Sequence, residues 1–171
     1  MHAKAAAIEL MVFDIDGVMT DGRLYFSPRG DEMKAFSSRD GFGLKLLAKG
    51  GVRQAIITGR ESPIVIERAA NLGIDLVLQG IEDKRSALAE LLEALGLDFS
   101  VTGFMGDDLI DLPAMRACAF SATVPDAHPL VRRHADHVCI QPAGLGAVRE
   151  VCELILKARG RWDEVVAPYL V

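Results

Sequence analysis

Two aspartates one residue apart, Asp14 and Asp16, follow an apolar run that spans residues 8–13 and is interrupted only by Glu9. Such a run predicts a buried strand, and side chains alternate faces along a strand, so the two carboxylates diverge if the strand continues. Gly17 lets the backbone break at this point, and both carboxylates can then converge. A buried pair of like charges is unfavourable unless a cation or a proton compensates it. The pair therefore predicts a metal site and a covalent role for one carboxylate.

Length and composition favour one well-packed domain, and we expect residues 1–171 to form it. The net charge of −5 argues against nucleic acid or an anionic membrane as the main partner. No apolar stretch approaches the roughly 18 residues of a membrane span, and residues 1–7 lack the apolar core of a signal peptide. The three cysteines lie far apart among apolar neighbours, which is typical of reduced thiols. These features predict a cytoplasmic protein.

Short apolar runs alternate with amphipathic segments of helix length, a pattern typical of a parallel sheet with helices on both faces. The predicted class is α/β with a Rossmann-like sheet. The predicted strands span residues 9–13, 53–58, 76–79, 101–105, 120–123 and 137–140. The predicted helices span residues 42–49, 62–72, 84–95, 109–116, 128–134 and 147–158. An apolar tail at about 160–171 is expected to dock on this subunit or on a neighbour.

The alternation is broken once, by an insertion at about residues 22–37. Residues 23–26 and 33–37 flank a loop with turn residues, which predicts a β-hairpin. Because the insertion follows the acidic pair, it should project over the carboxyl edge of the sheet, where open α/β sheets bind ligands.

Three further polar groups follow strands or open a helix. They are the segment Thr58-Gly59-Arg60, the single Lys84, and the acidic cluster Asp107, Asp108 and Asp111. If the strands are parallel neighbours, these groups gather at one edge of the sheet with the acidic pair.

This set of residues matches the needs of phosphoryl transfer. Asp14 can attack phosphorus to give an aspartyl phosphate, and Asp16 can protonate the leaving oxygen and then activate water. Thr58, the Gly59 backbone and the Lys84 ammonium can hold and neutralise the phosphoryl oxygens. The acidic cluster completes an oxygen-ligand site suited to Mg²⁺.

Two sets of segments resemble known phosphatases. Residues 13–18, 57–60, 84 and 106–108 resemble the four motifs of the haloacid dehalogenase superfamily. Residues 34–36, 39–43, 106–111, 126–130 and 146–152 resemble the narrower 3-deoxy-D-manno-octulosonate 8-phosphate phosphatase family, and the match runs from about residue 8 to about 158. The resemblance implies an Mg²⁺-dependent phosphatase that releases phosphate from this sugar-acid phosphate through an aspartyl phosphate, in lipopolysaccharide precursor synthesis.

The resemblance also implies roles for single residues. Asp14 is the implied nucleophile and Asp16 the implied general acid/base, with Mg²⁺ held by Asp14, the Asp16 carbonyl and Asp107. Asp108 and Asp111 match acidic positions behind these ligands. The implied contacts to the sugar acid are Ser37, Ser38, Arg39, Asp40, Gly41, Lys45, Gly59, Arg60 and Arg68. Arginine suits a substrate with phosphate and carboxylate groups because its contacts are bidentate. Leu145 departs from the family pattern, which has an arginine there.

The spacing of the motifs leaves no room for a cap domain, although aspartyl phosphate chemistry benefits from the exclusion of water. The resemblance implies a homotetramer in which hairpins pack together and neighbouring chains close each site. Apolar hairpin residues are consistent with such an interface: Leu24, Phe26, Met33 and Phe36.

Alternative functions are a phosphatase for a related nonulosonate 9-phosphate and a catalytically inactive interaction domain. The complete set of motif residues argues against the inactive domain. A phospho-acceptor signalling module is excluded because the strand predicted at 76–79 has no aspartate at its end. His128, His134 and His137 are expected to be structural, since their spacing forms no metal set.

Overall fold

The computed structural model describes residues 2–171 and is built around a parallel sheet in the order β5-β4-β1-β6-β7-β8. These strands are β5 (Leu76–Leu78), β4 (Arg53–Ile57), β1 (Leu10–Phe13), β6 (Thr102–Met105), β7 (Phe120–Thr123) and β8 (His137–Val138). The predicted α/β class with a Rossmann-like parallel sheet is confirmed.

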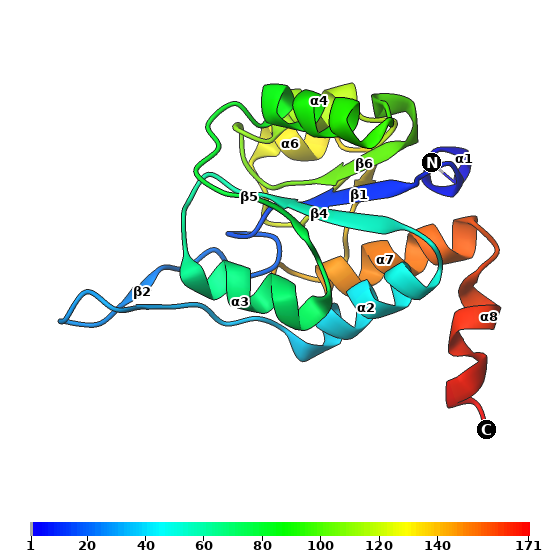
Figure 1. Ribbon diagram of the computed structural model, residues 1–171, viewed down its shortest axis with the longest axis horizontal. Helices are drawn as coiled ribbons and strands as arrows, with labels where there is room; N and C mark the ends of the chain where they lie inside the picture. Colours follow the sequence, from blue (N-terminus) through cyan, green and yellow to red (C-terminus); the bar gives the residue numbers. More distant parts are fainter. Residues whose placement is uncertain (1) are drawn as a thin grey trace.

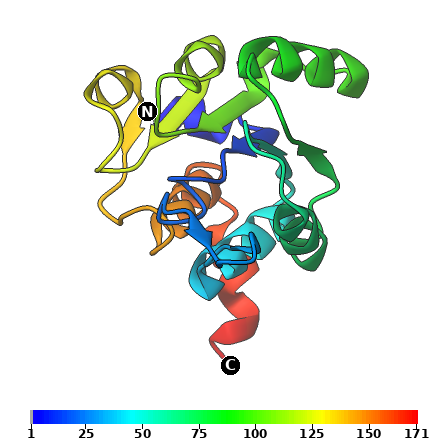
Figure 2. The same ribbon diagram turned by 90° about the vertical axis from the view of Figure 1, so that its left-hand side faces the viewer.

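Helices cover both faces of the sheet, as Figures 1 and 2 show. One face carries α2 (Ser38–Lys49), α3 (Pro63–Leu72) and α7 (Ala147–Ala158), and the other carries α4 (Lys84–Leu95), α5 (Leu112–Ala117) and α6 (Pro129–His134). The short α1 (His2–Ala6) packs on α7. Within residues 2–171, no helix has the length and apolar character needed to cross a bilayer.

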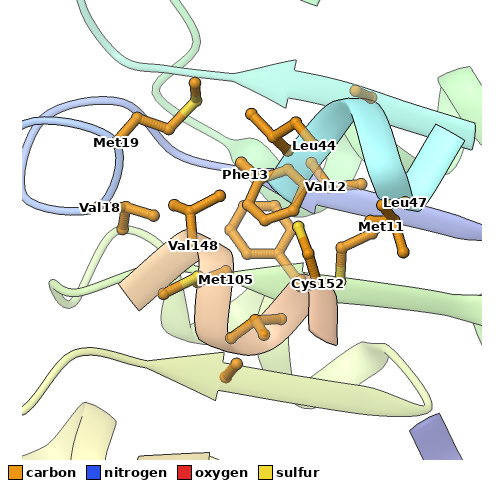
Figure 3. Packing of buried hydrophobic residues seen from close by; sticks show 14 of the residues in the cluster. Met11, Val12, Phe13, Val18, Met19, Leu44, Leu47, Met105, Val148 and Cys152 are labelled. Carbon is orange, nitrogen blue, oxygen red and sulfur yellow. The ribbon is translucent and has the colours of Figure 1, made fainter. Parts of the chain in front are cut away.

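The central strand β1 is buried along its whole length. Such a strand has no face exposed to solvent, so its sequence is a continuous apolar run and does not alternate between apolar and polar residues. Figure 3 shows Phe13 between α2, which contributes Leu44 and Leu47, and α7, which contributes Val148 and Cys152. This packing anchors the end of β1, from which the acidic pair emerges.

The register of the sheet places the carboxyl ends of β1, β4 and β6 beside one another. Phe13 at the end of β1 is paired with Ile56 on β4 and with Met105 on β6. The next residue, Asp14, donates its backbone N–H to Met105 at 3.0 Å. The polar segments that follow these three strands therefore meet at one edge, as predicted.

A small hairpin follows β1, and no cap domain is present in residues 2–171. Its strands, β2 (Tyr25–Phe26) and β3 (Glu32–Met33), are shorter than the predicted 23–26 and 33–37. The hairpin base lies near the carboxyl edge of the sheet, and its tip extends away from the body in Figure 1. Between β4 and α4 the chain forms only α3 and β5, as predicted.

Two predicted helix starts were wrong by more than one residue, and those predicted at 62 and 128 lie one residue early. Helix α2 begins at Ser38 rather than at residue 42, because the Ser37 side chain caps it by accepting a hydrogen bond from the Asp40 N–H. Helix α5 begins at Leu112 rather than at residue 109, because the preceding residues form a turn bonded to the Asp111 carboxylate. The helices predicted at 84–95 and 147–158 have the predicted bounds.

The tail docks on its own chain through two elements that were not predicted, α8 (Trp162–Val166) and the 3₁₀-helix η2 (Ala167–Tyr169). The Tyr169 ring meets Phe42 of α2 edge-on, with 5.4 Å between ring centres, and its hydroxyl accepts a 3.1 Å hydrogen bond from Lys49. The expected docking of the tail on this subunit is thus observed.

Candidate active site

Four charged side chains, which we call the acidic cradle, meet at the carboxyl edge of the sheet: Asp14, Lys84, Asp107 and Asp111. Lys84 Nζ lies 2.8 Å from the Asp14 carboxylate and 2.5 Å from that of Asp111. The carboxylates of Asp14, Asp107 and Asp111 can each offer an oxygen within 4.8 Å of the others. The predicted convergence of these residues is confirmed.

The turn after β6 is arranged around the Asp111 carboxylate, which is fully buried. One of its oxygens accepts the backbone N–H groups of Asp107 and Asp108 at 3.0 and 3.1 Å, and the other accepts from Lys84. Thr123 on β7 donates its hydroxyl to the Gly106 carbonyl at 2.7 Å, which holds the start of the turn. Asp111 thus holds the backbone of Asp107 in place, and its expected position behind the metal ligands stays a prediction.

Burial of these like charges raises the pKa values of two of the carboxylates. Burial and the neighbouring Asp111 raise the pKa of Asp14 from 3.8 to about 6, against the opposing effect of Lys84. Burial, Asp111 and Asp14 raise the pKa of Asp107 to about 8. For Lys84, burial lowers the pKa, but the two paired carboxylates outweigh it and hold the pKa above its usual value. Without a metal ion, the carboxylates of the cradle therefore favour bound protons.

The donor set of the cradle fits Mg²⁺, which prefers carboxylate and carbonyl oxygens. Asp107 reaches this site across Gly17, where a Cβ would lie 2.2 Å from the Asp107 carboxylate. Gly17 also has φ +91°, a conformation that other residues rarely adopt. The glycine is therefore required for the close approach of the two loops. Asp14 and Asp107 are candidate ligands in this cradle, and the expected contribution of the Asp16 backbone carbonyl stays a prediction.

Asp16 belongs to a second group of charges, which we call the hairpin-base network: Asp16, Glu32, Lys34 and Arg60. Lys34 Nζ pairs with the Asp16 carboxylate and lies 3.5 Å from that of Glu32. Arg60 lies 3.3 Å from Glu32 and 3.8 Å from Asp16. Arg60 follows Thr58 and Gly59 at the end of β4, and Thr58 is buried beside the end of β1.

The comparisons with known proteins agree with this geometry. Residues 64–150 match the haloacid dehalogenase-like hydrolase family. The 3-deoxy-D-manno-octulosonate 8-phosphate phosphatase of Escherichia coli K12 is 45% identical over 95% of this chain and 86% of its own length. The chain belongs to this phosphatase family of haloacid dehalogenase-like hydrolases.

Solved structures of two phosphatases of this name have the same fold. That from Moraxella catarrhalis, in complex with a magnesium ion, a phosphate ion and KDO, has a TM-score of 0.97 and 43% identity, covering 98% of this chain and 97% of its own. The cobalt-bound form from Haemophilus influenzae has a TM-score of 0.89 and 40% identity, covering 93% of each chain. The fold of the phosphatase family thus extends over nearly the whole chain.

The residues that the family pattern implies for substrate binding lie in different surroundings. Ser37 caps α2, Ser38 and Arg39 are exposed in its first turn, and Lys45 is exposed one turn later. Arg68 on α3 donates to the Ser37 carbonyl at 3.1 Å and lies over the Phe36 ring at 5.5 Å. It approaches so closely that a Cβ at Gly41 would meet it at 2.4 Å. Their contact with substrate stays a prediction.

Asp40 has a different place from the one expected for a substrate contact. Its carboxylate is buried and accepts the backbone N–H groups of Gly146 at 3.2 Å and Arg149 at 2.8 Å, at the start of α7. Burial raises its pKa, and these two hydrogen bonds oppose the rise. The observed contacts give Asp40 a structural role, because it joins the first turn of α2 to that of α7.

One further group of metal-ligating residue types lies beside β8: His137, Cys139 and Glu150. His137 Nε2 lies 2.9 Å from one Glu150 oxygen, and the backbone N–H groups of Ile140 and Gln141 each donate to Glu150 at 3.0 Å. Both carboxylate oxygens are thus engaged. These hydrogen bonds join the strand to α7. The prediction that no metal-ligating set includes His137 was wrong, because folding brings Cys139 and Glu150 beside it; its structural role stays a prediction.

Glu32, Lys34 and Ser62 were not predicted to be neighbours of the site. Glu32 accepts a 2.6 Å hydrogen bond from the Ser62 hydroxyl, and this bond lowers the pKa of Glu32. Glu32 and Lys34 are two residues apart on one extended segment, so they share a face. That spacing of opposite charges was the available signal, although it does not identify the partner of Lys34.

Proposed function

We propose that this chain hydrolyses 3-deoxy-D-manno-octulosonate 8-phosphate to the free sugar acid and phosphate. The acidic cradle is the observation that carries this function, because it places a nucleophilic carboxylate, an ammonium and two more carboxylates at the ends of β1 and β6. Family membership indicates which substrate to expect, since the Moraxella catarrhalis phosphatase binds magnesium, phosphate and KDO. Neither the related nonulosonate 9-phosphate nor an inactive interaction domain is favoured by these relatives.

Asp14 attacks the phosphorus of the substrate and forms an aspartyl phosphate, which water then hydrolyses. Asp16 protonates the leaving oxygen in the first step and takes a proton from the attacking water in the second. Lys84 holds Asp14 in position and neutralises a phosphoryl oxygen, with Thr58 and the Gly59 backbone as further donors. When bound, Mg²⁺ supplies charge stabilisation and a template for the phosphoryl group.

The substrate carries a carboxylate as well as a phosphate, so its recognition needs cations outside the cradle. Arg60 is half-exposed beside Asp16, and Arg68 lies on α3, where it donates to the Ser37 carbonyl. We assign these arginines to the sugar acid, with Ser37, Ser38, Arg39, Gly41 and Lys45 as the surrounding wall. Arginine provides the planar, bidentate geometry that carboxylates need.

The wider setting follows from the same assignment. We propose one domain over residues 1–171, a cytoplasmic location, a role in lipopolysaccharide synthesis, and a homotetramer. The hairpin supports the tetramer, because Leu24, Phe26 and Met33 are exposed on it and apolar surface of this kind is suited to burial between subunits. The molar mass in solution, measured by light scattering, tests the subunit number.

Phosphate release from the eight-carbon substrate and from a nonulosonate 9-phosphate, each with and without Mg²⁺, tests the function. We expect turnover only with Mg²⁺ and a higher kcat/KM for the eight-carbon acid. Better turnover of the nine-carbon acid would contradict the proposed substrate, and equal turnover without a divalent ion would contradict the proposed metal.

A further inference from the structure

Lys34 is an unusual cation, because it lies on a small projecting hairpin and yet its side chain is only 1% exposed. A buried ammonium is unfavourable unless carboxylates compensate its charge. Two do so here, Asp16 from the loop after β1 and Glu32 from β3. Lys34 thus joins the hairpin to the proposed general acid/base.

Glu32 is the centre of the network that holds Lys34. Besides Lys34, it accepts a 2.6 Å hydrogen bond from the Ser62 hydroxyl and a 3.3 Å hydrogen bond from Arg60. Ser62 immediately precedes α3, so Glu32 fastens the hairpin to the body of the molecule. Each hairpin strand has only two residues, so its ladder cannot by itself fix where the base lies.

The side chain of Asp16 needs such a partner because of its place in the chain. It lies beyond the end of β1, in a turn that contains Gly17, where the sheet no longer holds the backbone. A carboxylate there, next to the like charges of the cradle, is stabilised by cations beside it, and the half-exposed Arg60 lies 3.8 Å away. Lys34 is the buried cation in contact with it.

We propose that Lys34 is a positioning residue that aims the Asp16 carboxylate at the leaving oxygen, and that Glu32 holds Lys34 for this purpose. The hairpin is then part of the catalytic apparatus of its own chain, whatever contacts its tip makes. This inference rests on the proposed function, in which Asp16 protonates the leaving group.

The test compares two substrates whose leaving groups need this proton to different degrees. An alkyl sugar phosphate has a poor leaving group, whereas p-nitrophenyl phosphate releases a stable anion. The parameter to compare is kcat/KM, which reports the steps up to leaving-group release. For Lys34→Met we expect a loss of about 10²-fold on the sugar phosphate, the usual size of a general acid effect, and a loss of at most a few-fold on the aryl phosphate.

Three variants make the result specific. Lys34→Arg should recover much of the loss, because it restores the cation, and Glu32→Gln should show the same substrate dependence in weaker form. Arg29→Met is the matched control, since this exposed cation lies at the tip of the same hairpin, and it should leave both rates unchanged.

Other outcomes would overturn the proposal. Equal losses on both substrates would indicate general damage to the fold, and a raised KM with unchanged kcat would indicate that Lys34 binds the sugar acid directly. Wild-type rates on both substrates would show that Lys34 is dispensable. If Asp16→Asn itself fails to discriminate between the two substrates, the assigned role of Asp16 is wrong, which separates failure of the proposed function from failure of the Lys34 assignment.

Discussion

The acidic cradle and the hairpin-base network lie side by side at the same edge of the sheet, but their charges balance differently. The cradle holds three carboxylates, from Asp14, Asp107 and Asp111, against the single ammonium of Lys84, and has a net charge of −2 when ionised. The hairpin-base network holds two carboxylates against two cations and is neutral. Only the cradle therefore requires a divalent cation, and only the hairpin-base network is complete without one.

The cradle and the hairpin-base network also differ in how deeply their side chains are buried. The Lys84 and Asp111 side chains are almost completely buried, so water cannot compensate a missing partner in the cradle. In the hairpin-base network, Arg60 is 43% exposed and the two carboxylates keep some contact with solvent. The cradle should thus be sensitive to every lost charge, and the hairpin-base network should affect catalysis more than stability.

The largest expected effect is the loss of the nucleophile. Asp14→Asn should lower kcat by on the order of 10⁴-fold or more, because an amide cannot form the acyl phosphate. The fold should remain, since the substitution relieves repulsion within the cradle. Phosphate release and thermal unfolding measure the two effects, with Asp126→Asn, an exposed aspartate, as the control. Substantial turnover by the amide variant would disprove the assignment of Asp14.

The two buried lysines provide a direct comparison of the two regions. Lys84→Met should lower the free energy of unfolding by about 3–5 kcal/mol at neutral pH, since it leaves the buried carboxylates of Asp14 and Asp111 without their cation. Lys34→Met should lower it by only about 1–2 kcal/mol, because water can reach Asp16 and Glu32. Urea unfolding of both variants measures the difference. Equal losses would show that the charge balance does not distinguish the regions.

The stability of the metal-free protein should fall as pH rises from about 4 to about 8. The folded-state pKa values of Asp14, about 6, and Asp107, about 8, lie above the ordinary 3.8, so the folded protein binds more protons than the unfolded chain in this window. Each unit of pKa difference corresponds to about 1.4 kcal/mol, so the expected change is several kcal/mol. Melting temperatures across this range test it.

Saturating Mg²⁺ should abolish this decline, because the cation replaces the bound protons, and Asp107→Asn should flatten it in the metal-free protein. A metal-free protein whose stability rises between pH 5 and 8 would contradict the description of the cradle as a site with uncompensated charge.

The smallest expected effect on stability belongs to Arg60. Arg60→Gln should change the free energy of unfolding by less than about 1 kcal/mol, because half-exposed ion pairs contribute little. If Arg60 meets the sugar acid, the variant should instead raise KM for that substrate, with less effect on p-nitrophenyl phosphate. An unchanged KM would remove Arg60 from the substrate site.

The cradle could be predicted from the sequence because its parts are local. Asp14 and Asp107 each follow a buried strand, and in a parallel sheet such ends meet at one edge. Lys84 opens a helix whose bounds were predicted correctly. Helix α2 was predicted too short because Ser37 was interpreted as part of a strand, although a serine before a helical segment is also a common cap.

The parallel sheet, the absence of a cap domain in residues 2–171 and the chemical groups at the strand ends could all be predicted from the sequence, since periodicity and strand order suffice for these. The partners of Lys34 and Asp40, by contrast, became known only from the folded structure. Lys34 meets a carboxylate 18 positions away, and Asp40 caps a helix that begins more than 100 positions later. No local pattern encodes such pairs, because they depend on how separate segments pack.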